Sequence, residues 1–312
     1  MDRRPLTLLL AAATVLLGVP TAVRLVGDGG LKWLVLLAAV VPLLAVPLLV
    51  LGVVQLVLRR RVLALVTAVL LALNVAWLVP LYVAADVSAG ESLTVVTANL
   101  RFGEADADAI VRMVREQRVD VLATEELTEG AVARLRAAGL DELLPYAELA
   151  PHKEADGCGL WSRFPLDSLP PLEARFQSPG AVLHTATRDV VVRVMHPFPA
   201  NLTGAGQYRR DYARLTEQVR HLDDLTPTVL AGDFNATTDD AALRDLMGDR
   251  FRDASEVAGS GFQRTWSPRL GWPALLHLDH VLVDGHFDVR STRVMDLPGS
   301  DHRALLARLV LP

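Results

Sequence analysis

Apolar residues dominate the first 90 positions and form three long runs, at 6–26, 33–58 and 62–85. Each run is long enough to cross the hydrocarbon core of a bilayer, which takes about 20 apolar residues in a helix. The first run, preceded by Arg3 and Arg4, is also typical of a signal peptide. Because two further runs follow, a cleaved signal does not account for the whole region. We therefore expect three transmembrane helices.

From residue 91 onward the pattern changes to short apolar strands that alternate with amphipathic helices. We expect helices at 105–118, 130–138 and 208–225, and strands at 92–100, 119–123, 159–162, 190–195, 278–283 and 287–294. Strands that alternate with helices and end in a run of strands are typical of an α/β layered sandwich. The chain is thus expected to consist of a membrane anchor, residues 1–90, and one α/β domain, residues 91–312.

Charge separates the two parts further. Residues 1–90 contain seven of the 31 basic and three of the 36 acidic residues, which gives them a net charge of +4 and leaves −9 for residues 91–312. The positive-inside rule places Arg3, Arg4 and the triplet 59–61 in the cytoplasm, so that three crossings leave the domain outside. The three runs carry no ionisable residue deep in their interior, which argues against a transporter.

The chemically most informative segments lie at the ends of two predicted strands. Gly-Asp-Phe-Asn at 232–235 follows the apolar residues 228–230, and Ser-Asp-His at 300–302 precedes the apolar segment 304–311. Strand ends hold polar side chains rigidly on one point. The carboxylate, amide and imidazole groups of these segments suit a divalent cation and a proton-transfer step. This combination indicates metal-assisted hydrolysis.

Other polar residues take similar places at the ends of predicted strands. Each has an ordinary alternative explanation: Asp233 could cap a helix beginning near residue 238, and Asn99 could end its strand in a turn. Eight such residues at strand ends nevertheless favour one shared site. They are Asn99, Glu126, His196, Asp233, Asn235, Asp279, Asp301 and His302.

With these motifs the chain resembles the endonuclease/exonuclease/phosphatase superfamily, which includes pancreatic-type deoxyribonucleases, abasic-site endonucleases, inositol polyphosphate 5-phosphatases and bacterial sphingomyelinases. The resemblance covers about residues 92–312 and implies a four-layer α/β/β/α sandwich with its site at one end of two packed sheets. Its motifs are Thr-Ala-Asn at 97–99, the segment 120–126, Ser-Arg-Phe-Pro at 162–165, His-Pro at 196–197, Gly-Asp-Phe-Asn at 232–235, Leu-Asp-His-Val at 278–281 and Ser-Asp-His at 300–302.

The resemblance implies a metal site. Glu126 is then the principal metal-binding carboxylate, with Asn99 and Asp301 as further ligands. Mg²⁺ or Mn²⁺ is expected, since hard oxygen ligands suit these ions.

The resemblance also implies catalytic roles. Asp233 and Asn235 would orient the attacking water and hold a phosphate oxygen, and His302 would pair with Asp279 in an acid–base couple. His196 would contact the phosphate or protonate the leaving oxygen. Either His302 or Asp233 could take the proton of the water, and the resemblance does not decide between them.

One position departs from the family pattern. The residue before the metal-binding glutamate is usually glutamine, whereas this chain has Glu125. Glu125 would then add a negative charge beside the metal, or, with the frame shifted by one residue, would itself be the ligand in place of Glu126.

The sequence predicts a phosphoester substrate without specifying which. Arg209, Arg210 and Arg214, with Tyr208 and Tyr212, could form a nucleic-acid-binding patch, but a solvated helix face is the better interpretation. A domain anchored outside a membrane would meet both lipid head groups and extracellular nucleic acid. We therefore expect a membrane-anchored phosphodiesterase or nuclease, with a lipid head-group phosphodiesterase or a non-catalytic binding module as alternatives. No protein partner is implied.

Overall fold

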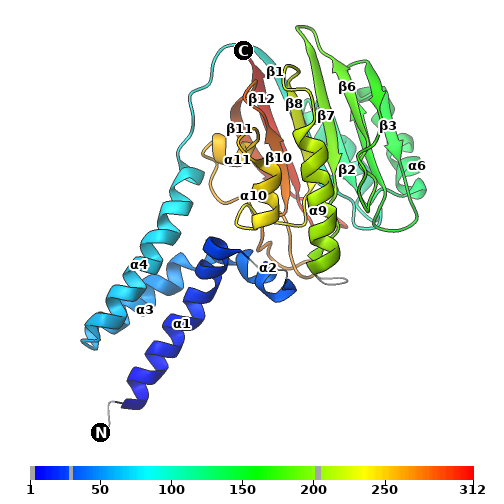
Figure 1. Ribbon diagram of the computed structural model, residues 1–312. Coiled ribbons are helices and arrows are strands. Elements are labelled where there is room, and N and C mark those ends of the chain that lie inside the picture. The colour runs from blue at the N-terminus through cyan, green and yellow to red at the C-terminus, as the bar shows by residue number, and fades with distance from the viewer. Residues whose placement is uncertain (1–3, 28–30, 201–204) are drawn as a thin grey trace.

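The computed structural model describes residues 4–27, 31–200 and 205–312, and its C-terminal part is built on two six-stranded sheets (Figure 1). The first sheet has the order β11-β12-β1-β2-β4-β3 and the second β5-β6-β7-β8-β10-β9. The strands are β1 (Glu91–Asn99), β2 (Val121–Glu125), β3 (Tyr146–Ala150), β4 (Cys158–Ser162), β5 (Leu166–Leu169), β6 (Gly180–His184), β7 (Asp189–Met195), β8 (Thr228–Asp233), β9 (Arg252–Asp253), β10 (Asp279–Val283), β11 (Asp288–Met295) and β12 (Ala304–Leu311).

Each sheet contains one parallel pair at its centre. β1 runs parallel to β2, and β7 runs parallel to β8. A parallel pair needs a crossover connection, which α5 (Ala107–Gln117) supplies in the first sheet and α9 (Ala205–Arg220) in the second. Asn99 at the end of β1 contacts Asp233 at the end of β8, so the carboxyl ends of these four central strands lie at one edge of the sandwich.

Apolar side chains divide the sandwich into layers. Leu93, Val95 and Val121 of the first sheet pack against Val192 and Val229 of the second, all fully buried. On the outer faces, α5 and α6 (Glu129–Ala137) cover the first sheet, while α9 and α10 (Ala241–Met247) cover the second. The order is helix, sheet, sheet, helix, which agrees with the expected α/β sandwich.

The sequence explains why α5 forms where it does. Asp106 caps its first turn by accepting a hydrogen bond from the backbone of Ala109, 3.0 Å away, and Arg118 ends it in the left-handed conformation. Ile110 and Val114, one turn apart, are buried against the sheet. The predicted helix at 105–118 is therefore confirmed.

The pattern missed several short elements, namely β3, β5, β6, β9, α7 (Leu140–Leu143) and α11 (Ala254–Val257). β3 and β5 are edge strands with half-exposed residues, so neither shows a continuous apolar run. The helix predicted at 208–225 ends at Arg220, because the side chain of Asp223 accepts hydrogen bonds from Leu225 and Thr226 and forms a turn. Asp240, rather than Asp233, caps α10.

The expectation of three membrane-crossing helices is not confirmed. Within the described residues, two helices are long and apolar enough to cross a bilayer, α1 (Arg4–Val26) and α4 (Arg61–Leu78) continued by the 3₁₀ turn η2 (Val79–Tyr82). The predicted run 33–58 is divided into α2 (Lys32–Ala38), the 3₁₀ turn η1 (Val41–Leu43) and α3 (Ala45–Val57). Pro42 lies in the turn, where its ring prevents a continuous helix. At 1.5 Å per residue, α3 is roughly 20 Å long, less than the roughly 30 Å hydrocarbon core.

The polar residues within the apolar helices hold the helices together. Gln55 of α3 donates a hydrogen bond to Thr14 of α1 and accepts one from Thr67 of α4, both at 2.8 Å. Asn74 of α4 donates to Thr21 of α1 at 3.0 Å. Such bonds between apolar helices stabilise a bundle. They account for the polar residues in these runs without a transport pathway.

Candidate active site

The site lies at the edge of the sandwich where the carboxyl ends of β1, β2 and β8 meet the start of β10. The register pairs Asn99 with Glu125 in the first sheet and Asp233 with Asp279 in the second. The two sheets pack face to face, so these strand ends come together. All eight residues singled out in the sequence lie at this edge. Asn99, Asp233 and Asp279 are fully buried there.

Asn99 connects the two sheets. Its side-chain nitrogen donates hydrogen bonds to Oε1 of Glu126, 3.2 Å away, and to Oδ2 of Asp233, 2.9 Å away. Its side-chain oxygen accepts a hydrogen bond from the backbone of Arg101 at 2.9 Å. Asn99 therefore fixes the separation of two carboxylates in this arrangement, and its role as a metal ligand stays a prediction.

Two of the site residues have a left-handed backbone. Glu126 has φ +55° and Asn235 has φ +51°. Non-glycine residues rarely adopt this conformation, which costs about 1–3 kcal/mol unless the surroundings hold it. Here the backbone of Phe102 donates to Oε2 of Glu126 at 2.7 Å, and the side chain of Asn235 donates to the carbonyl of Pro197 at 3.1 Å. Both side chains are held in place at the mouth of the site.

His302 and Asp279 form the expected pair. Nδ1 of His302 donates to Oδ2 of Asp279 at 2.9 Å, and its Nε2 lies 3.6 Å from Oδ2 of Asp233. Burial alone would lower the pKa of His302, but the charges of Asp279 and Asp233 and the hydrogen bond with Asp279 raise it to about 10. His302 therefore carries a proton and a positive charge at neutral pH, held between two carboxylates.

This pairing predicts a pH-dependent stability. The folded pKa of His302, about 10, exceeds its ordinary value of 6.5, so its contribution to folding is complete below pH 6.5 and disappears as the pH rises through 10. In chelator, we expect wild type to exceed His302→Gln in melting temperature by a larger margin at pH 6 than at pH 10. Tryptophan fluorescence during heating measures the melting temperatures of the two proteins at each pH. An equal margin at the two pH values would contradict the assigned charge.

His196 lies on the other side of Asp233. Its Nε2 is 3.7 Å from Oδ2 of Asp233, and its ring packs against Phe176 with centroids 4.8 Å apart. Burial lowers the pKa of His196 to about 4, in spite of the attraction of Asp233 and with a further contribution from the charge of His302. His196 is thus neutral at pH 7, and it differs in charge from His302 although both face the same carboxylate.

Glu125 is the position that departs from the family pattern, and the structure accounts for it. The side chain is fully buried and accepts a hydrogen bond from Thr97 at 3.0 Å. Burial, and then the nearby charges of Asp279 and Asp233, raise the pKa of Glu125 well above its usual value. A protonated glutamic acid has the charge and nearly the shape of glutamine. The expectation that Glu125 adds a negative charge beside the metal stays a prediction, and the burial and raised pKa of Glu125 weigh against it.

The structure also separates the two adjacent glutamates. Glu125 points into the buried interior at the end of β2, whereas Glu126 is half-buried at the opening of the site. Burial raises the pKa of Glu126, with hydrogen bonds from Phe102 and Asn99 opposing the shift. This placement favours Glu126 as the metal ligand over the shifted frame.

The remaining predicted ligand, Asp301, is half-buried at the same opening, with Oδ1 3.7 Å from Nε of Arg101. One ligand atom from each of Asp233, Asp279 and His302 lies within 4.8 Å of the others. Asp233, Asp279, Glu126 and Asp301 present carboxylate oxygens at this edge, whereas His302, when protonated, offers no free nitrogen to a metal. Such a donor set fits a hard divalent cation such as Mg²⁺ or Mn²⁺.

Sequence reasoning missed the contribution of Ser300. Its hydroxyl donates to the backbone carbonyl of Asn99 at 2.8 Å and accepts from the backbone of His302 at 3.0 Å. Ser300 therefore ties the segment that carries His302 to the end of β1. Its position in the Ser-Asp-His motif was the only signal for this role.

A second buried group, Asp253, His277 and His280, was not expected either. His280 donates from Nδ1 to Asp253 at 2.5 Å and from Nε2 to the carbonyl of Ala236 at 2.9 Å. Burial opposes the charge of His280, but these bonds and the charge of Asp253 raise its pKa, while burial lowers the pKa of His277 to about 3. Both ring nitrogens of His280 donate a hydrogen bond, so His280 and Asp253 form an internal ion pair that joins β10 to β9.

The predicted basic-aromatic patch divides between two faces of α9. Tyr208 and Tyr212 are buried against the second sheet, whereas Arg209, Arg210 and Arg214 are exposed. This arrangement supports the solvated-face interpretation.

Solved structures with the same fold are numerous. One is an endonuclease/exonuclease/phosphatase from Bacteroides vulgatus, with 17% identity and a TM-score of 0.56, where the match covers 71% of this chain and 100% of the other. Another is D. rerio TDP2 complexed with a single-strand DNA product, with 14% identity and a TM-score of 0.57 over 70% of this chain and 99% of the other. At these identities the likeness shows the fold alone.

Sequence comparison is more decisive about the family. No curated protein matches the chain significantly. The model of the Endonuclease/Exonuclease/phosphatase family matches residues 96–302, which is more than half of the chain and includes every residue of the site described above. The chain therefore belongs to the endonuclease/exonuclease/phosphatase family.

Proposed function

We propose that this protein is a metal-dependent phosphoester hydrolase held at a membrane by its N-terminal helices. One observation carries the proposal: Asn99, Glu126, Asp233, Asp279 and His302 converge at one edge of the sandwich, with the direct contacts given above. Members of this family are typically hydrolases of this kind. The intact set of acidic, amide and imidazole groups argues against a non-catalytic binding module.

We assign the metal to the open side of the site. Glu126 and Asp301 would hold the ion, and Asn99 keeps Glu126 at a fixed separation from Asp233. When bound, a divalent cation polarises a phosphoryl oxygen and offsets the negative charge that develops in the transition state.

The charges of the side chains suggest how the proton moves. His302 already carries a proton in this arrangement, whereas Asp233 receives its hydrogen bonds from Asn99 and from the backbone of Asn235. We therefore assign Asp233 as the group that orients the attacking water and accepts its proton. His302, oriented by Asp279, would stabilise the negative phosphoryl oxygens, and neutral His196 would contact the phosphate beside it.

The N-terminal helices support a membrane location. Large apolar side chains cover the outer surfaces of α1, α3 and α4, including Leu8 and Leu16, which are 71% and 72% exposed. So much exposed apolar surface is unfavourable in water. We propose that α1 and α4 cross the bilayer, with residues 91–312 on the extracytoplasmic side. In Figure 1, α1 and α4 run in the same direction and α3 returns the chain between them, so the start of α1 and residues 91–312 lie at opposite ends of the helical bundle. The basic residues 59–61, at the turn between α3 and α4, favour the far end of the bundle as the cytoplasmic one.

Metal removal tests the proposed chemistry. The full-length protein in lipid nanodiscs is assayed on bis-p-nitrophenyl phosphate with Mg²⁺ or Mn²⁺, before and after treatment with a chelator. We expect chelation to lower turnover to below about 1% and added Mn²⁺ to restore it, because transition-state charge is left without its counter-ion. Turnover that survives chelation would reject the metal-dependent mechanism. A folded protein without turnover under any condition would support the binding module.

A further inference from the structure

The active site opens toward the N-terminal helices. In Figure 1 the linker after α4 rises along the sandwich to its far end, and β1 then runs back toward α2. The carboxyl end of β1, which carries Asn99, therefore lies at the edge of the sandwich that faces the N-terminal part. Val35 of α2 is buried in one apolar cluster with Met195, Ala200 and Phe234 of the sandwich. A segment of the predicted anchor thus packs directly beside the site.

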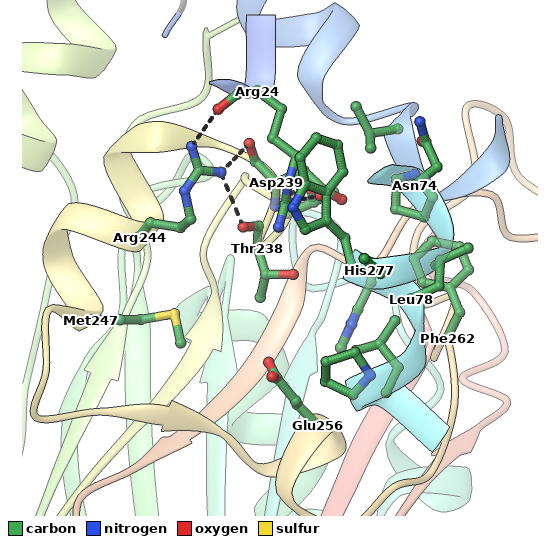
Figure 2. A pocket seen from close by; sticks show the side chains of 17 residues that line it. Arg24, Asn74, Leu78, Thr238, Asp239, Arg244, Met247, Glu256, Phe262 and His277 are labelled. Carbon is green, nitrogen blue, oxygen red and sulfur yellow. Dashed lines mark hydrogen bonds and ion pairs between the residues drawn. The ribbon is translucent and has the colours of Figure 1, made fainter. Parts of the chain in front are cut away.

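An ion pair holds the same two parts together. Figure 2 shows Arg24, near the end of α1, among Asp239 and Arg244, which follow the Gly-Asp-Phe-Asn segment. Arg24 pairs with Asp239, and Arg244 donates to the backbone carbonyl of Arg24 at 3.1 Å. The guanidinium of Arg24 also lies 4.3 Å from the ring centroid of Trp77 in α4. The first helix is therefore fixed to the loop that leaves the site.

A small cavity of about 100 Å³ lies between α2 and the site. Val35, Leu36 and Ala39 form one wall, and Trp266 and Leu276 form the other. Asn235, at the mouth of the active site, lines the same cavity. The cavity thus begins at a group proposed to hold phosphate and continues between largely apolar side chains.

The loop after Trp266 extends the apolar character to the surface. Leu270, Trp272 and Leu275 are exposed by 47%, 57% and 40%. Leu270 and Trp272 also border a larger hollow of about 410 Å³ that His302 lines. Exposed apolar groups close together usually mark a surface that meets a lipid or protein partner.

We propose that the substrate is a phosphoester of a membrane lipid, whose hydrocarbon next to the ester enters the cavity between α2 and Trp266. This inference rests on the proposed hydrolase function. The observations that favour a lipid are the apolar cavity beside Asn235, its lining by residues of α2, which lies in the chain between the two long apolar helices, and the exposed apolar loop. The net charge of −9 on residues 91–312 disfavours a nucleic acid.

The reaction is a hydrolysis. The oxygen of a water molecule bonds to phosphorus, the bond from phosphorus to the oxygen of the leaving alcohol breaks, and that oxygen takes a proton. Because the lipids are phosphodiesters, the products are an alcohol and a phosphomonoester, with no oxidant and no co-substrate other than water.

The test compares two substrates on one preparation. Full-length protein is reconstituted with Mn²⁺ into vesicles of phosphatidylcholine, phosphatidylethanolamine, phosphatidylglycerol and sphingomyelin, all with labelled head groups. Release of label is divided by hydrolysis of soluble bis-p-nitrophenyl phosphate. Ala39→Trp, which fills the cavity, is expected to lower this ratio at least tenfold. Val46→Trp, at an exposed position of α3 away from the cavity, is the matched control and should keep the ratio.

A second variant guards against misfolding of the first. Leu270→Ser with Trp272→Ser alters only the exposed loop and is expected to lower the same ratio. Hydrolysis of the soluble ester without release of lipid label, or with cleavage of single-stranded DNA instead, would overturn the lipid inference and leave the proposed function standing. An unchanged ratio in Ala39→Trp would overturn the role of the cavity. Failure on every substrate, including the soluble ester, would reject the proposed function itself.

Discussion

Replacing His302 by alanine is expected to lower turnover of bis-p-nitrophenyl phosphate at least about 100-fold. The side chain supplies a positive charge between Asp279 and Asp233, and positioned acid–base groups typically contribute 10²–10⁴-fold to a rate. Asp233→Ala should cause a loss of similar size, because Asp233 is assigned to the attacking water. The initial rate at saturating Mn²⁺ measures both effects.

A surface pair of the same kind provides the control. His184 contacts Asp189 and Asp167 at 2.8 Å and 3.1 Å, but it is exposed and lies beside the start of β7, at the opposite end of that strand from His196. His184→Ala should therefore leave the rate near that of wild type. Because alanine at position 302 leaves Asp279 buried without its partner, His302→Gln is measured beside it together with the melting temperature. More than a tenth of wild-type turnover in both His302→Ala and Asp233→Ala would refute the mechanism.

The second large effect is expected at Glu126. Glu126→Gln removes the negative charge at the opening of the site and should weaken Mn²⁺ binding more than about 100-fold, since even residues that only orient metal ligands contribute 10–100-fold. Glu125→Gln should retain most turnover, because Glu125 is buried away from the opening of the site and its pKa is raised, which favours the neutral form that glutamine resembles. The two changes are chemically identical and one residue apart.

Calorimetric titration of Mn²⁺, with the rate at saturating metal, distinguishes the two glutamates. Loss of metal binding in Glu125→Gln with normal binding in Glu126→Gln would show that the frame is shifted by one residue. Equal losses in both would show that the charge of Glu125 matters and that its carboxyl group is ionised.

Local sequence signals predicted much of the sandwich. The strands that carry Asn99, Asp233 and Asp279 have continuous apolar or β-branched runs because both of their faces are buried, and such runs are visible without knowledge of the fold. Edge strands such as β3 and β5 have no such pattern, because partly exposed residues interrupt it. The pattern therefore found the strands that carry the site and missed strands that border it.

The site was less predictable in its charges than in its members. The motifs assign His302 and His196 different roles but do not give their charges: two carboxylates raise the pKa of the first, while burial lowers that of the second. The same holds for Glu125 and Glu126, which differ in burial and in hydrogen-bond partners. Charge states depend on long-range packing, which a local pattern does not contain.

In the N-terminal region the error is an element that was predicted from composition and does not form, namely one continuous helix over residues 33–58. Residues 33–58 are apolar enough for one helix, and composition alone does not reveal the turn at Pro42. The structure turns at Pro42 and uses the first part, α2, as a packing surface for the sandwich. Hydropathy does not distinguish a residue that faces lipid from one that faces another part of the same protein.

The joint between the two parts has a kinetic consequence. Besides the Arg24 pair, the backbone of Ala85 donates to the carbonyl of Val257 at 2.9 Å, that of Gly261 to Leu81 at 2.7 Å, and that of Ser88 to the side chain of Asp288 at 2.7 Å. These contacts fix the sandwich to the N-terminal helices at several points, so the two parts are joined rigidly and not by a flexible linker alone. With α1 and α4 in a bilayer, the site would stay at a constant height above it and search in two dimensions by lateral diffusion. Its rate would then follow the mole fraction of substrate in the surface, and diluting that surface with inert lipid would slow it even when the total amount of substrate is unchanged.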